Sequence, residues 1–381
     1  MKILLILSFL ITLMLQSFAQ QIDTLEIESE HFEEKRTVYI HKPQFYKYKS
    51  ENGKLPVYYI LDGQHKWFVD PTLNTIKYLQ YTHDIPQAII VVIPLKNRYK
   101  ECPIDSLEGE NLPLHSFITE ELSKELEKYG TNGFNLLVGH SFSASFALYS
   151  YSKAPDFYSA IFAHSPLDKL SKVIAYLSAN RIDLSKIFLS VGGAVKDNYH
   201  RENCELLKKE QPEFFEEISY YEANYSSHTS VPIVANPIFF SQLFELFKVR
   251  YDEIAEVDLD YKLIANPSSI KAEKQKMDKA SIFKKKKFLI EVAEINGIAS
   301  RYWHNEFNDH AIAIYNNGIK LYPKYYEFHI NLGELYLTKN KAKAKKYLKE
   351  GKNLFEIYEQ DLEYKEEILD EINELIEETK K

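Results

Sequence analysis

Four short apolar runs constrain the fold of this chain more than any other feature. They lie at residues 57–61, 88–93, 134–138 and 187–189, and apolar and polar residues hardly alternate within them. A strand that is covered on both faces of its sheet has this pattern, because both sets of side chains must be apolar. Segments with helical periodicity separate the runs, as in a parallel sheet covered by helices. Residues 23–251 therefore predict an α/β fold.

Weaker signals complete this expected sheet. Further strand-like runs lie at residues 37–40, 160–163 and 218–223. The helices expected between and after the strands are 112–129, 143–153, 169–180, 201–211 and 237–251.

The chain changes character after Tyr251. The next segment is rich in charged residues and serine and has little apolar periodicity, so we expect a linker at residues 253–277. Beyond it the pattern is helical, and small and large residues recur at a shift of 33 to 34 positions. The first set, Ala299, Tyr302, Ala311, Tyr315 and Gly318, corresponds to Gly333, Tyr336, Ala344, Leu348 and Gly351.

This recurrence resembles a pair of tetratricopeptide repeats, with Pro323 closing the first unit and Glu356 at the equivalent place in the second. A generic helical bundle with accidental matches is the alternative. We expect an all-α domain at residues 278–381, whose segment 361–381 is charged enough to form a solvent-facing cap. Two repeats are few, so we expect them to dock against a protein: the preceding domain, another copy of the chain or a separate partner.

The first residues have the features of a secretory signal peptide. Lys2 precedes an apolar run at residues 3–15, and Ser17 and Ala19 supply the small residues of a cleavage site. The run is well short of the roughly 20 residues that span a membrane. We therefore expect residues 1–19 to be removed and the mature protein to be periplasmic or secreted, without a membrane span. The first domain is then expected at residues 20–252.

Charge and cysteine content exclude several other classes. A formal net charge of −8 leaves no basic surface for nucleic acid. Cys102 and Cys204 permit at most one disulfide, and the sequence leaves open whether they pair. No metal-binding motif such as His-Glu-x-x-His and no glycine-rich phosphate loop occurs, so we expect neither a metal nor another cofactor.

The clearest candidate for chemistry is Ser141, which lies between an expected buried strand and an expected helix. In a nucleophile elbow the chain turns so sharply that small residues must stand two before and two after the serine. Gly139 meets this requirement, and Ser143 stands where a second glycine is usual. Unpaired N–H groups at the start of the helix favour a developing oxyanion, so the Phe142 amide is one expected donor.

A serine hydroxyl needs a histidine to accept its proton, and an acid to hold that histidine, in the chain order Ser, Asp or Glu, His. His228 follows the last expected strand in a polar loop and is our general-base candidate. His140, His164 and His200 are weaker alternatives, and in such an elbow the His140 side chain should point elsewhere. The candidate acid is Asp197, with Glu202 next, and a Ser-His dyad without an acid is a third option.

The second oxyanion donor is expected in the loop after the strand at residues 57–61. Gly63 allows close approach of a backbone, so the amide of Gly63 or Gln64 is the candidate, with an ordinary turn as the alternative.

Six ordered segments across about residues 22–251 resemble the putative-esterase family of α/β-hydrolases, which includes enterochelin esterases, esterase D or S-formylglutathione hydrolases, feruloyl esterases and mycolyltransferases. The segments are Leu61-Asp62-Gly63-Gln64, Asn97-Arg98-Tyr99-Lys100-Glu101, Phe117-Ile118-Thr119-Glu120-Glu121-Leu122, Gly139-His140-Ser141-Phe142-Ser143, Ser165-Pro166 and His228-Thr229-Ser230-Val231-Pro232. The resemblance implies an α/β-hydrolase sheet and assigns the nucleophile to Ser141 and the base to His228. The chain departs from the family at Ser143, at Leu167-Asp168, where a bulky aromatic residue is often found, and after Gly192-Gly193, where no acid follows directly.

Together these observations predict a metal-independent serine esterase that acts through an acyl-serine intermediate on a siderophore or carbohydrate ester. Transfer of the acyl group to a sugar or lipid would differ only in the acceptor. The alternative from another class is a catalytically weak hydrolase-fold protein whose helical repeats hold a protein partner.

Overall fold

A computed structural model of the protein describes residues 22–193, 198–359, 362 and 364–381. The expected signal peptide and Asp197 lie outside these residues. Among the described residues, no helix is both long enough and apolar enough to cross a membrane.

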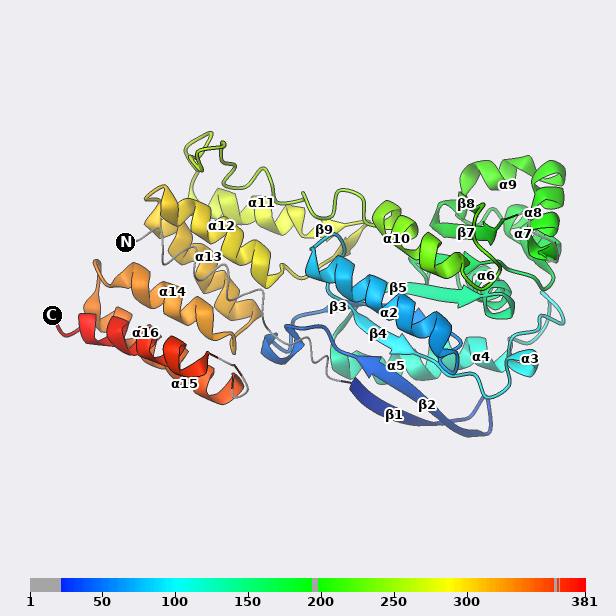
Figure 1. Ribbon diagram of the computed structural model, residues 1–381, viewed down its shortest axis with the longest axis horizontal. Coiled ribbons are helices and arrows are strands. Elements are labelled where there is room, and N and C mark those ends of the chain that lie inside the picture. The colour runs from blue at the N-terminus through cyan, green and yellow to red at the C-terminus, as the bar shows by residue number, and fades with distance from the viewer. Residues whose placement is uncertain (1–21, 194–197, 360–361, 363) are drawn as a thin grey trace.

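The centre of the fold is an eight-stranded, mainly parallel sheet (Figure 1). Its strands lie in the spatial order β1-β2-β4-β3-β5-β6-β7-β8. The strands β3 to β8 pair in parallel, and the β1–β2 hairpin adds antiparallel strands at one edge. The bounds are β1 Ile22–Ser29, β2 Glu34–His41, β3 Leu55–Ile60, β4 Ile89–Val92, β5 Thr131–His140, β6 Ala160–His164, β7 Ile187–Gly192 and β8 Ser219–Ala223.

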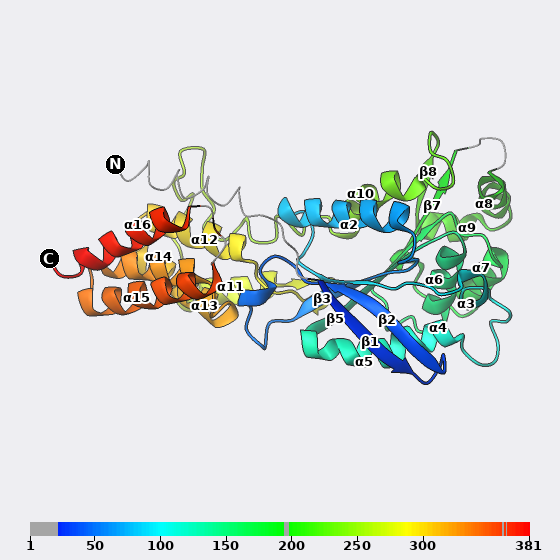
Figure 2. The same ribbon diagram turned by 60° about the horizontal axis from the view of Figure 1, so that its bottom comes forward.

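Helices cover both faces of this sheet, which explains the continuous apolar runs (Figure 2). On β3, Val57 and Tyr59 belong to one apolar cluster, and Tyr58 and Ile60 belong to the cluster on the other face. One face is covered by α2 (Lys66–Tyr81) and α10 (Val231–Leu243). The other carries the helical run from α4 (Pro113–Ser116) through η2 (Phe117–Leu122) and α5 (Ser123–Leu126) to η3 (Glu127–Tyr129), followed by α6 (Phe142–Lys153) and α7 (Leu170–Ala179). The remaining elements of this part are η1 (Tyr46–Tyr48), α3 (Arg98–Glu101), η4 (Leu184–Lys186), α8 (Tyr199–Glu210) and α9 (Pro212–Glu217).

The C-terminal part is helical, as expected. It comprises α11 (Ile270–Ala280), a short hairpin of β9 (Ile282–Phe283) and β10 (Lys286–Lys287), and then α12 (Val292–His304), α13 (Asn308–Leu321), α14 (Tyr326–Tyr336), α15 (Lys341–Tyr358) and α16 (Lys365–Glu378). The helices α12 and α13 form one contacting pair and α14 and α15 another, and α16 packs on α15. Because α11 begins at Ile270, part of the segment expected as a linker is helical.

Both described cysteines, Cys102 and Cys204, are free and buried.

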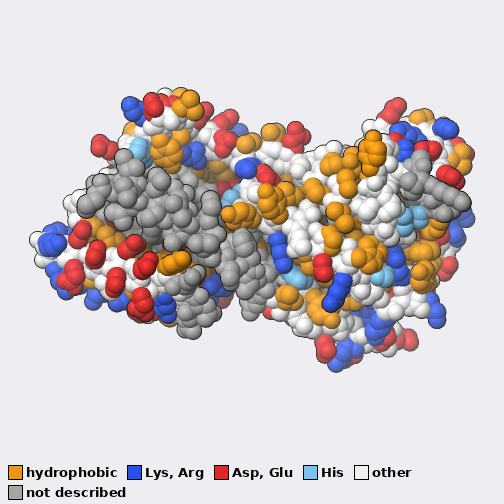
Figure 3. All heavy atoms as spheres, viewed as in Figure 1, with side chains coloured by type: hydrophobic (Ala, Val, Ile, Leu, Met, Phe, Trp, Pro, Cys, Tyr) orange, Lys and Arg blue, Asp and Glu red, His pale blue; other side chains and the backbone are white. Residues whose placement is uncertain are grey.

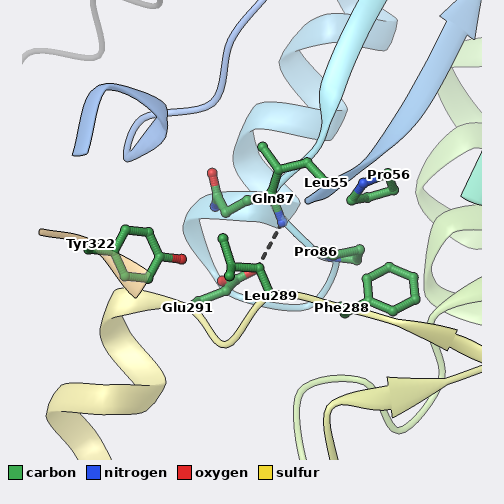
Figure 4. Close-up of a pocket in the computed structure, with 8 residues that line it drawn as sticks. All are labelled: Leu55, Pro56, Pro86, Gln87, Phe288, Leu289, Glu291 and Tyr322. Atoms are coloured by element: carbon green, nitrogen blue, oxygen red, sulfur yellow. Dashed lines mark hydrogen bonds between the residues drawn. The ribbon is translucent and has the colours of Figure 1, made fainter. Parts of the chain in front are cut away.

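The helical region packs against the amino-terminal edge of the parallel strands. Glu291, just before α12, accepts a hydrogen bond from the backbone N–H of Gln87 (2.8 Å) and contacts Nδ1 of the His83 ring (3.0 Å). A small pocket at this junction lies between Leu55 at the start of β3 and Tyr322, the residue that follows α13 (Figure 4). Parallel strands carry their functional loops at the opposite, carboxyl-terminal edge. The helical region therefore lies at one end of the molecule, and the loop after β5 lies at the other (Figure 1).

Candidate active site

Ser141 occupies a sharp turn between β5 and α6, as expected. Its backbone has φ 60° and ψ −117°, a conformation that a non-glycine residue rarely adopts. A Cβ atom at Gly139 would lie 2.4 Å from the Ser143 carbonyl oxygen, so only glycine fits two residues before the serine. Strained backbone of this kind is characteristic of functional sites, and the turn presents Ser141 at the carboxyl end of β5.

Ser143, the departure from the usual pattern, makes contacts that glycine could not make. Its side chain is fully buried, and its hydroxyl donates to Oδ2 of Asp62 (2.6 Å) and accepts from the His140 N–H (2.8 Å). The Ser143 hydroxyl therefore links the turn at Ser141 to the loop that follows β3 through a hydrogen bond. The extra side chain at this position is part of the site's framework.

Asp62 and Arg98 complete this framework, and sequence reasoning assigned a role to neither of them. Asp62 is buried and has φ 57°, and Arg98 Nη2 lies 3.1 Å from its Oδ2. The same Arg98 nitrogen donates to the His140 carbonyl (2.9 Å). The available signal was position, since both residues follow central strands, β3 and β4, at the edge where Ser141 lies.

His228 lies against the elbow, in the loop between β8 and α10. Its ring centroid is 4.5 Å from that of His140, and His140 Nε2 is 2.8 Å from the His228 carbonyl oxygen. No hydrogen bond joins the Ser141 hydroxyl to the His228 ring, both of which are described. Such bonds are often long in enzymes without substrate and tighten when it binds.

The ring of His228 is held in its neutral form. Burial, followed by the neighbouring His140, His200 and Arg98, lowers the pKa of His228 to about 3. A neutral imidazole can accept a proton, as a general base must.

The structure places the three alternative histidines differently. His200 stacks on His228, with ring centroids 3.8 Å apart and an angle of 17° between the rings. His140 also contacts His228, although we expected its side chain to point elsewhere. His164 is fully buried between Ser190 and Asn236, each 2.8 Å from one ring nitrogen, which is a structural role.

The acid of the expected triad has no described counterpart. Asp197 lies outside the described residues, and Glu202 is exposed on α8. Within the described ranges, Nδ1 of His228 is buried and has no hydrogen-bond partner.

The oxyanion candidates differ in whether their amides are free. Phe142 is the first residue of α6, so its N–H has no partner within the helix. The Gly63 N–H donates to the Ile93 carbonyl (2.9 Å), and a Cβ at Gly63 would lie 2.7 Å from the Pro94 nitrogen. Glycine is thus needed there for close packing on β4, and Gln64 is the better donor candidate. The Gln64 side chain holds the loop by donating to Asp62 (3.1 Å) and accepting from the Leu95 N–H (2.8 Å).

A family model described as "Putative esterase" matches residues 29–228, which include both Ser141 and His228. The chain belongs to this family. Membership supports ester hydrolysis as the activity of the chain and a small-molecule ester as its substrate. No curated protein matches the chain.

Solved structures share the fold of this esterase. An uncharacterised protein from Capnocytophaga ochracea DSM 7271 matches with a TM-score of 0.55 and 13% identity, over 94% of this chain and 99% of that chain. An IroE-like serine hydrolase from Shewanella oneidensis matches with a TM-score of 0.58 and 18% identity, over 79% of this chain and 99% of that one. The enterobactin esterase FES from Shigella flexneri matches with a TM-score of 0.47 and 16% identity, over 61% of each chain.

The surface of the esterase part beside the site carries exposed apolar side chains. In the view of Figure 3, hydrophobic side chains are spread over the face formed by α2 and α10. Trp67, at the start of α2, is 42% exposed, and its ring lies edge-on to His140 with centroids 5.3 Å apart. The aromatic side chain of Trp67 therefore lines the surface beside the turn at Ser141.

Among the described residues, no group of three His, Cys, Asp or Glu side chains is placed to hold a metal ion.

Proposed function

We propose that this protein is a secreted serine esterase that hydrolyses a carboxylic ester through an acyl-serine intermediate. The observation that carries the proposal is the strained turn at Ser141, which lies at the carboxyl edge of the sheet with His228 packed against the residue before it. The fold shared with the IroE-like serine hydrolase, together with the family assignment, supports it.

In the proposed reaction, Ser141 Oγ attacks the ester carbonyl carbon while the neutral His228 ring accepts the hydroxyl proton. The oxyanion is stabilised by the Phe142 amide and the amide of Gln64. His228 then returns the proton to the leaving alcohol as the C–O bond breaks, which leaves the acyl group on Ser141. A water molecule, deprotonated by His228, attacks the acyl carbon, and the bond to Ser141 Oγ breaks as His228 returns the proton to that oxygen, which releases the acid.

We further propose a substrate of the siderophore-ester or carbohydrate-ester type, since enterochelin and feruloyl esterases belong to the family that the sequence resembles. Removal of residues 1–19 during export would place the enzyme in the periplasm or outside the cell. The two helix pairs α12–α13 and α14–α15 are proposed to be tetratricopeptide repeats. They dock on the sheet edge away from Ser141, which leaves their outer surface for a protein partner or a second copy.

The proposal is tested with a fluorophosphonate probe, which forms a covalent bond with an activated serine. The wild-type protein should be labelled, and Ser141→Ala should abolish labelling. Ser152→Ala is the matched control, because Ser152 lies in the same helix and donates only to the nearby Tyr149 carbonyl. His228→Ala should slow labelling strongly, and labelling indifferent to that change would refute the base assignment.

The second candidate function is that of a catalytically weak binding protein. The unpartnered Nδ1 of His228 among the described residues favours it. This candidate predicts that the wild-type protein is not labelled, and that release of para-nitrophenol from para-nitrophenyl acetate is the same for wild type and Ser141→Ala.

A further inference from the structure

Four aromatic rings form a column through the candidate base. Tyr199 stacks on His200 (centroids 4.5 Å apart, 26° between rings), and His200 stacks on His228 (3.8 Å, 17°). His140 closes the other side of His228 at 4.5 Å with a tilt of 44°. The column contains three imidazoles from three elements: the end of β5, the start of α8 and the loop before α10.

Contacts between ring faces, together with one backbone contact, hold His228 in this column. The His140 ring contacts the His228 backbone through Nε2, whereas Nδ1 of His140, His200 and His228 is buried without a partner in the described ranges. His140 and His200 are 2% and 3% exposed, so neither ring can turn without disturbing its neighbours. In a triad the acid orients the base through Nδ1. Among the described residues, no side chain makes that bond to His228.

We propose that His140 and His200 are positioning residues, which together fix the His228 ring for proton transfer with Ser141. His140 fixes the backbone of His228 relative to the elbow, because it immediately precedes Ser141. His200 fixes the plane of the ring by stacking. This inference rests on the proposed function, since it assigns a role in the same reaction.

The two neighbours also suit the charged state that His228 reaches during the reaction. Burial lowers the pKa of His140 to about 3, and it lowers the pKa of His200 against the opposing effect of the Ser165 and Pro166 backbone. Both rings therefore stay neutral when His228 takes the serine proton. The stack therefore places no second positive charge beside the imidazolium, while burial and the neighbouring rings keep the pKa of His228 low.

The test compares paired substitutions by the rate of para-nitrophenyl acetate hydrolysis. His200→Ala removes the stacked ring, whereas His200→Phe keeps a flat ring without its nitrogens. His140→Leu removes the contact with the His228 carbonyl, whereas His140→Gln keeps a donor on a side chain of similar reach. Misplacing a catalytic group by about 1 Å can cost on the order of 100-fold in rate. We expect kcat to fall about 10- to 100-fold in His200→Ala and His140→Leu, with KM changed less than about twofold. His200→Phe and His140→Gln should recover to within about threefold of wild type.

Controls separate positioning from folding and from the proposed function. His115→Gln also alters a buried histidine, which contacts Ser150 and lies away from the site, so it should leave kcat unchanged. If His200→Ala does not fold, by circular dichroism, His200→Asn replaces it. Wild-type kcat in His200→Ala or Asn and in His140→Leu, or equal losses in both members of each pair, would overturn the inference. The proposed function fails separately if Ser141→Ala keeps wild-type activity.

Discussion

At the scale of single residues, Ser143 shows how a departure from a motif can have a structural cause. Its hydroxyl is the closest donor to the buried Asp62 carboxylate, and Arg98 supplies the charge partner. The sequence showed only that Ser143 is small enough for the elbow. Its bonding could not be predicted, because Asp62 lies in a loop 81 residues earlier in the chain, and Arg98, which pairs with Asp62, lies 45 residues earlier.

Ser143→Ala should therefore destabilise the protein although it makes the residue smaller. Loss of a donor to a buried carboxylate costs on the order of 1–3 kcal/mol in the free energy of unfolding. The probe labelling rate of Ser141 should fall as well, because the elbow loses its tie to the loop after β3. Urea unfolding and labelling measure the two effects, with Ser152→Ala as the control. Unchanged stability would contradict the role of this hydroxyl.

The pH dependence of Ser141 labelling is also set at this scale. A base acts only while it is unprotonated, and the pKa of His228 is lowered from 6.5 to about 3, first by burial and then by His140, His200 and Arg98. The labelling rate should therefore stay nearly constant from pH 8 to about pH 5, as long as circular dichroism shows a folded chain. A rate that halves near pH 6.5 would show that His228 titrates like an exposed histidine.

At the scale of elements, the sequence predicted those that are buried on both faces and missed those with mixed patterns. All four non-alternating runs became central strands, because double burial leaves a strong signal. β1 was not predicted, because it is a half-exposed edge strand and so lacks a strong apolar pattern. α2 was not predicted because its sequence contains Pro71, which usually breaks a helix, and polar residues cover its outer side. α10 was expected to begin at Pro237, but it begins at Val231, and Pro237 lies inside the helix.

Small residues are expected where two helices of the helical region approach closely, and one pair of glycines tests this. A Cβ at Gly333 of α14 would lie 2.5 Å from Leu348 Cγ of α15, whereas a Cβ at Gly297 of α12 meets nothing within 4 Å. Gly333→Ala should reduce the free energy of unfolding by roughly 1–3 kcal/mol through overpacking. Gly297→Ala should raise it by roughly 0.5–1 kcal/mol, because alanine favours a helix over glycine.

Thermal and urea unfolding of the two variants give the comparison directly. Equal effects of the two substitutions would mean that α14 and α15 do not approach at Gly333. Labelling of Ser141 should be unchanged in both folded variants, because the helical region is docked at the opposite edge of the sheet.

At the scale of the whole molecule, the buried histidines couple stability to pH. Burial lowers the pKa of His41, His115 and His164 to about 4 and that of His140 and His228 to about 3. Each binds a proton in the unfolded chain below about pH 6.5 but not in the folded protein, so its contribution to stability is lost as the pH falls. Glu294 and Glu327 act in the opposite sense, because burial raises their pKa values to about 8 and about 7.

Between pH 6.5 and 4.5 these five histidines therefore outnumber the two opposing carboxyl groups by about three protons, or roughly 4 kcal/mol of unfolding free energy per pH unit at most. We expect the urea-derived free energy of unfolding to be clearly lower at pH 5 than at pH 7. His115→Gln should reduce this difference, because it removes one of the contributing rings, whereas His304→Gln, at an exposed position, should leave it unchanged. Equal stability at the two pH values would mean that these rings become protonated in the folded protein, and that the core around them accommodates their charge.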